Sequence, residues 1–262
     1  MMGGGKPLDL SRARILISND DGIEAPGLRL LERILKPLAA EVWVVAPLTE
    51  QSAAGHSLTL RRPLRINRLG PRRFTVDGTP TDCVLLGVNQ VMKDNRPDLV
   101  ISGINQGGNL GEDVTYSGTV AAAMEGTLMG IRAISLSQVT DDKRATRWAA
   151  SRKWTQGVLK KLAAQRWPQN VLINVNFPDV PAARVTGIEV TRQGNRKIGG
   201  QLAEGVDPRG DTYFWIGNQR IEDRFKAGTD LEAVIRGAVS ITPLTLDLTH
   251  ASTLKSLKAV FG

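Results

Sequence analysis

The sequence predicts an α/β fold: a Rossmann-like, doubly wound, mostly parallel sheet with a β-rich C-terminal extension. Short apolar runs at residues 14–18 and 42–46 are typical of buried strands, and between them leucine and isoleucine recur at helical spacing after Pro26. This strand–helix–strand order is that of a βαβ unit, whose two strands are parallel. The chain has 262 residues, 41% of them hydrophobic, which is enough for one sizeable core.

The same alternation continues along the chain to about residue 175. Residues 58–66 and 74–77 alternate between apolar and polar side chains, which predicts an antiparallel excursion from the sheet. A loop rich in glycine and asparagine is expected at 103–111. A sheet of this kind binds its ligands at the carboxyl ends of the strands. The other expected strands are 98–102, 132–136 and 171–175, and the expected helices are 81–91, 119–129 and 145–162.

The two ends of the chain differ from this regular part. Residues 1–13 include three successive glycines and have no periodicity, so we expect a flexible tail there and a single α/β domain over residues 14–262. Within that domain, the segment from about 180 to 262 is expected to be an extension that forms either a rim over the ligand site or a contact between subunits. Its expected elements are strands at 188–192, 213–216 and 239–244 and a helix at 253–260.

The composition argues against a membrane-spanning or secreted protein. No apolar run reaches the roughly 18 residues that cross a bilayer, and the N-terminal residues lack the apolar core of a signal peptide, so we expect a cytoplasmic protein. Cys83 is the only cysteine, which excludes intrachain disulfides and zinc sites built from several cysteines. Its apolar neighbours predict a place in the core.

The net charge of +8 raises the question of an anionic partner. Residues 1–137 carry 15 Lys and Arg against 14 Asp and Glu, so the basic excess belongs to the second half. The basic residues there are scattered, and aromatic residues make up only 5% of the chain, too few for a nucleic-acid stacking surface. A solvated helix face and a field that attracts phosphate-bearing substrates both account for this charge, and no specific nucleic acid is expected.

Two adjacent carboxylates, Asp20 and Asp21, follow the first predicted strand. If both point to one place, their like charges require a cation between them, and carboxylate oxygens select magnesium, manganese or calcium. A plain turn is the alternative, because an Asp-Gly sequence is common in turns. Ser52 and Asn105 also lie just past predicted strands and offer neutral oxygens that could complete a metal site at the same edge of the sheet.

The usual nucleotide-binding motifs are absent, since neither a dinucleotide fingerprint nor a P-loop occurs. Instead, Tyr116-Ser117-Gly118-Thr119 lies at a predicted helix start, where free N–H groups and hydroxyls can hold a phosphate. Simple N-capping by Ser117 or Thr119 is the alternative, and the two roles are compatible. The only histidines, His56 and His250, lack the spacing of a zinc site, so we expect structural or rim positions for them.

Several longer motifs resemble the SurE family of survival proteins, which are 5'/3'-nucleotidases. The resemblance covers residues 14 to about 245 and has no departure at the four candidate metal ligands. The matching motifs are ISNDDG at 17–22, AP at 46–47 with QS at 51–52, GTPTDC at 78–83, SGINQGGN at 102–109, YSGTVAAAMEG at 116–126 and SITPL at 240–244.

The resemblance implies a Rossmann-like fold and one divalent metal ion per subunit, Mg²⁺ or Mn²⁺, bound by Asp20, Asp21, Ser52 and Asn105. It also implies hydrolysis of nucleoside 5'- and 3'-monophosphates, with exopolyphosphatase as a possible side activity. The expected assembly is a homodimer or homotetramer built partly by exchange of C-terminal segments.

On this interpretation Asp20 and Asp21 are also the catalytic residues, because either can orient or deprotonate the attacking water. The expected phosphate-binding and supporting residues are Asn19, Asn109, Ser117, Gly118 and Thr119. Two alternatives remain. An aspartyl-phosphate mechanism needs an Asp-x-Asp motif whose first position is here Asn19, and a non-catalytic nucleotide- or RNA-binding protein leaves the Asp pair without a task.

Overall fold

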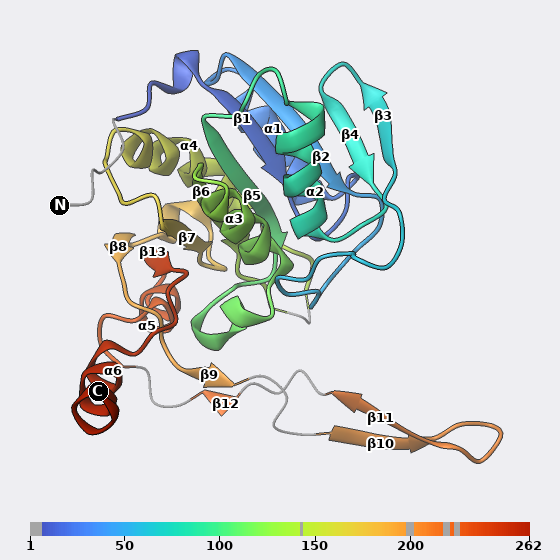
Figure 1. Cartoon of the computed structure of the whole chain (residues 1–262), viewed down its shortest axis with the longest axis vertical. Helices are drawn as coiled ribbons and strands as arrows, with labels where there is room; N and C mark the ends of the chain where they lie inside the picture. Colours follow the sequence, from blue (N-terminus) through green and yellow to red (C-terminus); the bar gives the residue numbers. More distant parts are fainter. Residues whose placement is uncertain (1–6, 142–143, 198–201, 217–220, 223–225) are drawn as a thin grey trace.

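The computed structural model of the chain is built on a nine-stranded sheet with the order β3-β4-β2-β1-β5-β6-β7-β13-β8 (Figure 1). The structure describes residues 7–141, 144–197, 202–216, 221–222 and 226–262. Five central strands are parallel, as the Rossmann-like prediction requires, and this part of the prediction is confirmed. They are β1 (Arg14–Ser18), β2 (Glu41–Pro47), β5 (Leu99–Gln106), β6 (Arg132–Gln138) and β7 (Val171–Phe177).

Helices cover both faces of the sheet (Figure 1). α1 (Pro26–Leu35) and α4 (Ala149–Ala163) pack on one face, and α2 (Pro80–Leu86) and α3 (Gly118–Leu128) pack on the other. Successive residues of β1 alternate between the two cores, with Leu16 on the side of α2 and α3. Burial on both faces explains why this strand is an unbroken apolar run in the sequence.

The antiparallel excursion lies at one edge of the sheet, where β3 (Ile66–Gly70) pairs with β4 (Arg73–Val76). The strand predicted at 58–66 was wrong for residues 58–65. Carboxylates take the place of a partner strand there, because Asp82 accepts from the N–H of Thr59 at 3.0 Å and Asp77 accepts from the N–H of Arg65 at 2.7 Å. The segment therefore stays irregular until β3 begins at Ile66.

Three other boundaries differ from the prediction. β5 continues through Gly103 to Gln106, into the expected loop, because Asn105 and Gln106 still pair with the end of β6 after an irregularity. The fourth helix begins at Ala149, later than the predicted residue 145. The helix predicted at 81–91 ends as α2 at Leu86 and continues as a π-helical turn over Gly87–Val91.

The C-terminal extension is β-rich, as predicted. β13 (Ala238–Thr245) joins the sheet antiparallel to β7 and parallel to β8 (Gly187–Val190). β10 (Leu202–Val206) and β11 (Thr212–Ile216) form a hairpin that projects away from the sheet (Figure 1). The remaining elements are β9 (Arg196–Lys197), which pairs with β12 (Ile221–Glu222), α5 (Asp230–Ile235) and α6 (Ala251–Phe261).

The first residues of the chain were predicted to be a flexible tail, and residues 1–6 lie outside the described part. The rest of that segment differs from the prediction, because it packs against the domain. The N–H of Leu8 donates to the carbonyl of Ala163 at 2.8 Å, and Leu10 is buried at the start of a short 3₁₀ helix, Leu10–Arg12. No helix among the described residues is long and apolar enough to cross a membrane.

Cys83 lies in α2 with its side chain fully buried, which confirms the predicted core position. Burial raises the pKa of its thiol well above the ordinary value, so Cys83 stays protonated and unreactive near neutral pH.

Candidate active site

The strand order places a crevice between β1 and β5. The connection after β1 leads through α1 to β2 on one side, whereas β5 lies on the other side of β1. The loops at the carboxyl ends of these strands therefore diverge, which is where open α/β sheets bind ligands. A cavity of about 390 Å³ lies there, and its lining includes six of the residues predicted from the sequence: Asp20, Asp21, Ser52, Asn105, Asn109 and Ser117.

Asp20 and Asp21 both line this cavity because the chain leaves strand geometry directly after Ser18. The amide of Asn19 donates to the carbonyl of Gly22 at 2.9 Å and closes a turn, and Gly22 has a positive φ of 94°. A strand would have pointed the two carboxylates to opposite faces. The turn, predicted from the sequence as the alternative to a metal site, is therefore present. It is compatible with a metal site, because it brings both carboxylates to the same cavity.

Neighbouring segments hold the two carboxylates. The hydroxyl of Thr119, on the first turn of α3, donates to Oδ1 of Asp20. Oδ2 of Asp21 accepts from the backbone N–H of Gln106, at the end of β5, at 3.1 Å. Gly118 packs so closely on Asp20 that a Cβ added there would lie 2.7 Å from the Cβ of Asp20.

The electrostatics of the pair favour a bound cation. Burial raises the pKa of Asp20, and burial together with the charge of Asp20 raises the pKa of Asp21 to about 7. No Lys, Arg or His in the described part of the chain forms an ion pair with either carboxylate, and the nearby Glu50 adds a further negative charge. A divalent cation at this position would offset charges that the protein itself leaves uncompensated.

The donor set fits a hard cation. Over the residues that the structure describes, no cluster of three or more His, Cys, Asp or Glu side chains is placed to hold a metal. A metal site at Asp20 and Asp21 thus has two carboxylate ligands, and neutral oxygen atoms must complete its coordination shell. Oxygen ligands are typical of magnesium and manganese.

Ser52 and Asn105 are the neutral oxygen donors that the sequence indicated, and both line the cavity. The hydroxyl of Ser52, in the exposed loop after β2, donates to Glu50 Oε1 at 2.7 Å. Asn105 donates through Nδ2 to the carbonyl of Gly107 at 2.8 Å, a bond that does not involve its Oδ1. The four predicted metal ligands thus come from three segments and meet at one cavity.

Asn109 is held in place by hydrogen bonds from its backbone and its side chain. Its backbone N–H donates to Asn176 Oδ1 at 2.8 Å, and its Nδ2 donates to the hydroxyl of Ser137 at 2.8 Å. Its carbonyl accepts from Nδ2 of Asn174 at 2.9 Å and from Nδ2 of Asn176 at 3.0 Å. The ends of β6 and β7 therefore fix this residue against the cavity.

Ser117 is the N-cap of α3, and its Oγ accepts from the N–H of Val120 at 3.0 Å. This confirms the predicted N-capping by Ser117. The side chain also lines the cavity, and a hydroxyl that accepts through its oxygen still has its proton to donate.

Three other predicted phosphate-site residues do not line the cavity. Asn19 and Thr119 are fully buried, and the Thr119 hydroxyl is engaged by Asp20. Gly118 packs directly on the Asp20 side chain. Thr119 and Gly118 contact Asp20 because the first turn of α3 faces it, whereas Asn19 bonds to the carbonyl of Gly22. Direct phosphate binding by these three residues stays a prediction.

Sequence reasoning missed several residues of the cavity. Glu50, Asp113 and Trp148 line it as well. Glu50 precedes the Gln51-Ser52 motif and could have been found through it, whereas Trp148 comes near only because α4 packs against α1. Asp113 follows Glu112 in a short 3₁₀ turn, and no motif spacing in the sequence marks it.

The two histidines lie outside the cavity lining. His56 lies in the loop that follows Ser52, and its Nε2 contacts Glu125 of α3 at 3.0 Å. This position agrees with the expected rim or structural role. His250 lies exposed at the start of α6.

Comparisons with known proteins identify the family of the chain. The family model described as "Survival protein SurE" matches residues 15–200. The curated "5'-nucleotidase SurE" of Paramagnetospirillum magneticum is 64% identical over 253 residues, covering 97% of each chain. The protein of the same name from Rhodospirillum rubrum is 57% identical over 256 residues, covering 97% of this chain and 98% of its own length.

A solved structure extends the comparison to three dimensions. The crystal structure of the SurE protein from Aquifex aeolicus superposes with a TM-score of 0.83 at 41% sequence identity. The match covers 95% of this chain and 100% of that one. Sequence and structure agree over nearly the full length, and the chain belongs to the SurE family.

Proposed function

We propose that this chain is a 5'-nucleotidase, a phosphoric monoester hydrolase that releases phosphate from nucleoside monophosphates in a metal-dependent reaction. The relatives that carry this name match it over nearly their whole length. The observation that carries the metal-dependent part is the Asp20–Asp21 pair, in which two adjacent carboxylates share one cavity without a basic partner among the described residues.

One divalent ion, Mg²⁺ or Mn²⁺, would be held by the residues already named for it: Asp20, Asp21, Ser52 and Asn105. Such an ion, when bound, lowers the pKa of a water ligand and offsets charge on the phosphoryl oxygens.

The chain's own residues divide the remaining work. Thr119 and Gly118 fix Asp20 from behind, so its free oxygen is held in one direction. Asp21 lies at the cavity with one oxygen bound to the N–H of Gln106, and either carboxylate can orient or deprotonate the attacking water. Burial of this pair strengthens every such interaction relative to water.

Asn109 and Ser117 are placed to bind the phosphate. The Nδ2 of Asn109 uses one of its two hydrogens for Ser137, and the Ser117 hydroxyl keeps its proton free of the capping bond. Both are fixed before substrate arrives, so their donors stabilise developing charge without having to reorganise.

The proposal extends to nucleoside 3'-monophosphates and, as a side activity, to the terminal phosphate of polyphosphate, because the polar groups named above address the phosphate rather than the base. It also includes a homodimer or homotetramer joined through C-terminal segments. Exposed apolar side chains on the β10–β11 hairpin and on α6 support this assembly: Leu202, Phe214, Trp215, Ile216, Val260 and Phe261.

A non-catalytic nucleotide- or RNA-binding protein is the alternative, and the net charge of +8 favours it. The acidic pair at the cavity speaks against it, because uncompensated carboxylates repel phosphate. A phosphate-release panel separates the two functions. Nucleoside 5'- and 3'-monophosphates, polyphosphate and p-nitrophenyl phosphate would be compared with Mg²⁺ or Mn²⁺. Turnover of the 5'-monophosphates supports the proposal, and tight nucleotide binding without phosphate release supports the alternative.

A further inference from the structure

The segment from Asn109 to Ser117 forms one wall of the cavity, and the central domain binds it near its two ends. Asn109 is bound by the ends of β6 and β7, and Ser117 caps α3. Between them lies the 3₁₀ turn Gly111–Thr115, which contributes Asp113 to the cavity lining. The middle of this wall is held by residues that come from the C-terminal extension.

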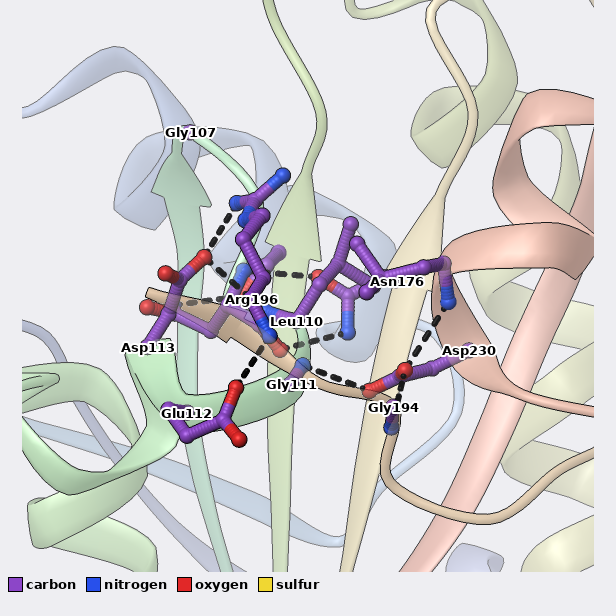
Figure 2. A network of polar contacts seen from close by, with 12 residues as sticks. Gly107, Leu110, Gly111, Glu112, Asp113, Asn176, Gly194, Arg196 and Asp230 are labelled. Carbon is purple, nitrogen blue, oxygen red and sulfur yellow. Dashed lines mark hydrogen bonds and ion pairs between the residues drawn. The ribbon is translucent and has the colours of Figure 1, made fainter. Parts of the chain in front are cut away.

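Asp230, the first residue of α5, holds the start of the turn. It is fully buried, and its Oδ2 accepts from the N–H of Gly111 at 2.9 Å. Its Oδ1 accepts from the N–H of Gly194 at 2.8 Å and from that of Leu231 at 2.8 Å. One carboxylate thus ties the cavity wall to two segments of the extension (Figure 2).

Arg196, in the short strand β9, holds the centre of the turn. Its guanidinium group binds the carboxylate of Asp113, and its backbone N–H binds Glu112 (Figure 2). The side chains of Arg196 and Asp113 are only 5% and 4% exposed, so neither can exchange its partner for water at low cost.

Close packing fixes the same contact sterically. A Cβ added to Gly111 would lie 3.1 Å from the backbone nitrogen of Arg196 and 3.1 Å from the carbonyl oxygen of Gly194. The amide of Gln193 adds a hydrogen bond to the carbonyl of Gly111 at 2.9 Å. The wall and the extension therefore meet backbone to backbone, and a shift of one moves the other.

We propose that Arg196 and Asp230 are positioning residues for substrate binding: from the C-terminal extension, they hold the Asn109–Ser117 wall where Asn109 and Ser117 meet the phosphate. This inference rests on the proposed function, which supplies the substrate role of those two residues. The metal ligands Asp20, Asp21, Ser52 and Asn105 lie on other segments, so the network acts on the phosphate side of the site.

The charge balance predicts how the network fails. Removal of the guanidinium group takes away a positive group that binds the buried carboxylate of Asp113 beside the cavity, and a buried carboxylate that loses such a group moves toward water or draws water in. A displacement of about 1 Å in a substrate-positioning group can lower kcat/KM by roughly a hundredfold. The effect should appear in the KM for the nucleotide before it appears in metal activation.

The test compares Arg196→Met with wild type and with Arg236→Met. Arg236 is a matched control, because it also lies in the extension and pairs with Glu189 at 2.6 Å, but it is half-exposed and does not contact the wall. Hydrogen exchange of residues 109–117 and steady-state kinetics with a nucleoside 5'-monophosphate would be measured on the full-length proteins.

We expect Arg196→Met to exchange amides of the wall about tenfold faster or more, since local opening becomes easier, while strands β1 and β5 stay protected. KM should rise about tenfold or more with the metal concentration for half-activation unchanged. Arg236→Met should match wild type in both. A purely structural role predicts instead a smaller active fraction with an unchanged KM.

Arg196→Lys keeps the positive charge but loses the planar guanidinium group, so we expect a KM between those of wild type and Arg196→Met. If Arg196→Met does not fold, Arg196→Lys serves as the test of the inference. Wild-type exchange in the wall, or a wild-type KM in the folded variants, would overturn the inference. Wild-type protein that releases no phosphate would contradict the proposed function instead, and the exchange measurement would still report whether Arg196 holds the wall.

Discussion

Asp20 is held by groups from separate segments of the chain. Its side chain accepts from the hydroxyl of Thr119, its carbonyl accepts from the N–H of Gln51 at 2.8 Å, and Gly118 lies against its Cβ. These contacts fix the side chain of Asp20, which also lines the cavity. A buried anion is costly unless it is compensated, so a residue built in this way serves a bound cation better than it serves stability.

Asp20→Asn tests the residue directly. The amide has nearly the same shape but one charge fewer, so we expect kcat/KM for a nucleoside 5'-monophosphate to fall by a factor of about 100 or more, or ~2.7 kcal/mol. The melting temperature should stay within a few degrees of wild type or rise. The exposed Asp94→Asn is the matched control and should keep wild-type kinetics. Full turnover by Asp20→Asn would show that the pair is only a turn.

Gly118→Ala tests whether close packing against Asp20 matters for activity. The added methyl group would lie 2.7 Å from the Cβ of Asp20, so the carboxylate must shift. We expect kcat/KM to fall about tenfold or more, because catalytic groups tolerate little displacement. Gly157→Ala, on an exposed helix face with no atom within 4 Å, should instead keep activity and gain about 0.5–1 kcal/mol of stability. Equal kinetics in both variants would refute the steric argument.

At the scale of elements, α1 packs against β5 just beside the cavity. Gly27 makes this possible, because a Cβ there would lie only 1.8 Å from the carbonyl oxygen of Ile104 and 2.8 Å from the ring of Trp148. The helix must therefore move if any side chain is added. Since the same strand carries Asn105 and Gln106, the position of α1 is linked to that of the proposed metal site.

Gly27→Ala is therefore expected to destabilise the fold as well as the site. Overpacking of this kind costs about 1–3 kcal/mol, which would appear as a lower urea midpoint with an unchanged slope. Gly157→Ala is the control, because the same substitution there is expected to raise the free energy of unfolding instead of lowering it. A Gly27→Ala protein as stable as wild type would mean that α1 and β5 are not in the close contact described.

The elements also show where sequence reasoning reaches its limit. β1 and β2 were predictable because both of their faces are buried and their apolar runs are unbroken. β5 continues past Gly103 because its partner β6 extends that far, which glycine and asparagine in the local sequence argued against. Residues 58–65 alternate like a strand, but side-chain carboxylates satisfy their N–H groups, and alternation alone does not reveal such acceptors.

On the scale of the whole molecule, the sheet topology brings the predicted metal ligands together. Asp20, Asp21, Ser52 and Asn105 follow or end strands β1, β2 and β5, which are neighbours in the sheet, so their convergence could be inferred from parallel pairing. Asp113 and Trp148 could not be found in this way. Their positions depend on how the C-terminal extension and α4 pack, and no short motif encodes that packing.

The extension leaves large apolar side chains in solvent when the chain is alone. Phe214 and Trp215 on the β11 strand are 58% and 69% exposed. We expect the wild-type protein to sediment as a dimer or tetramer, and replacement of both residues by Ser to weaken that assembly, because large exposed apolar patches mark contacts between proteins. Analytical ultracentrifugation measures this, with Leu128→Ser as the control, because Leu128 is 63% exposed and lies outside the extension. A monomeric wild type would contradict the proposed assembly.

The most direct test of the account is metal dependence of phosphate release. Purified protein would be treated with chelator, freed of it, and assayed with a nucleoside 5'-monophosphate while Mg²⁺ or Mn²⁺ is added back. The account predicts almost no release from the stripped wild type, saturable recovery with added metal, and no recovery for Asp20→Asn. Undiminished phosphate release by the stripped wild type would contradict the claim that the Asp20–Asp21 pair acts through a bound cation.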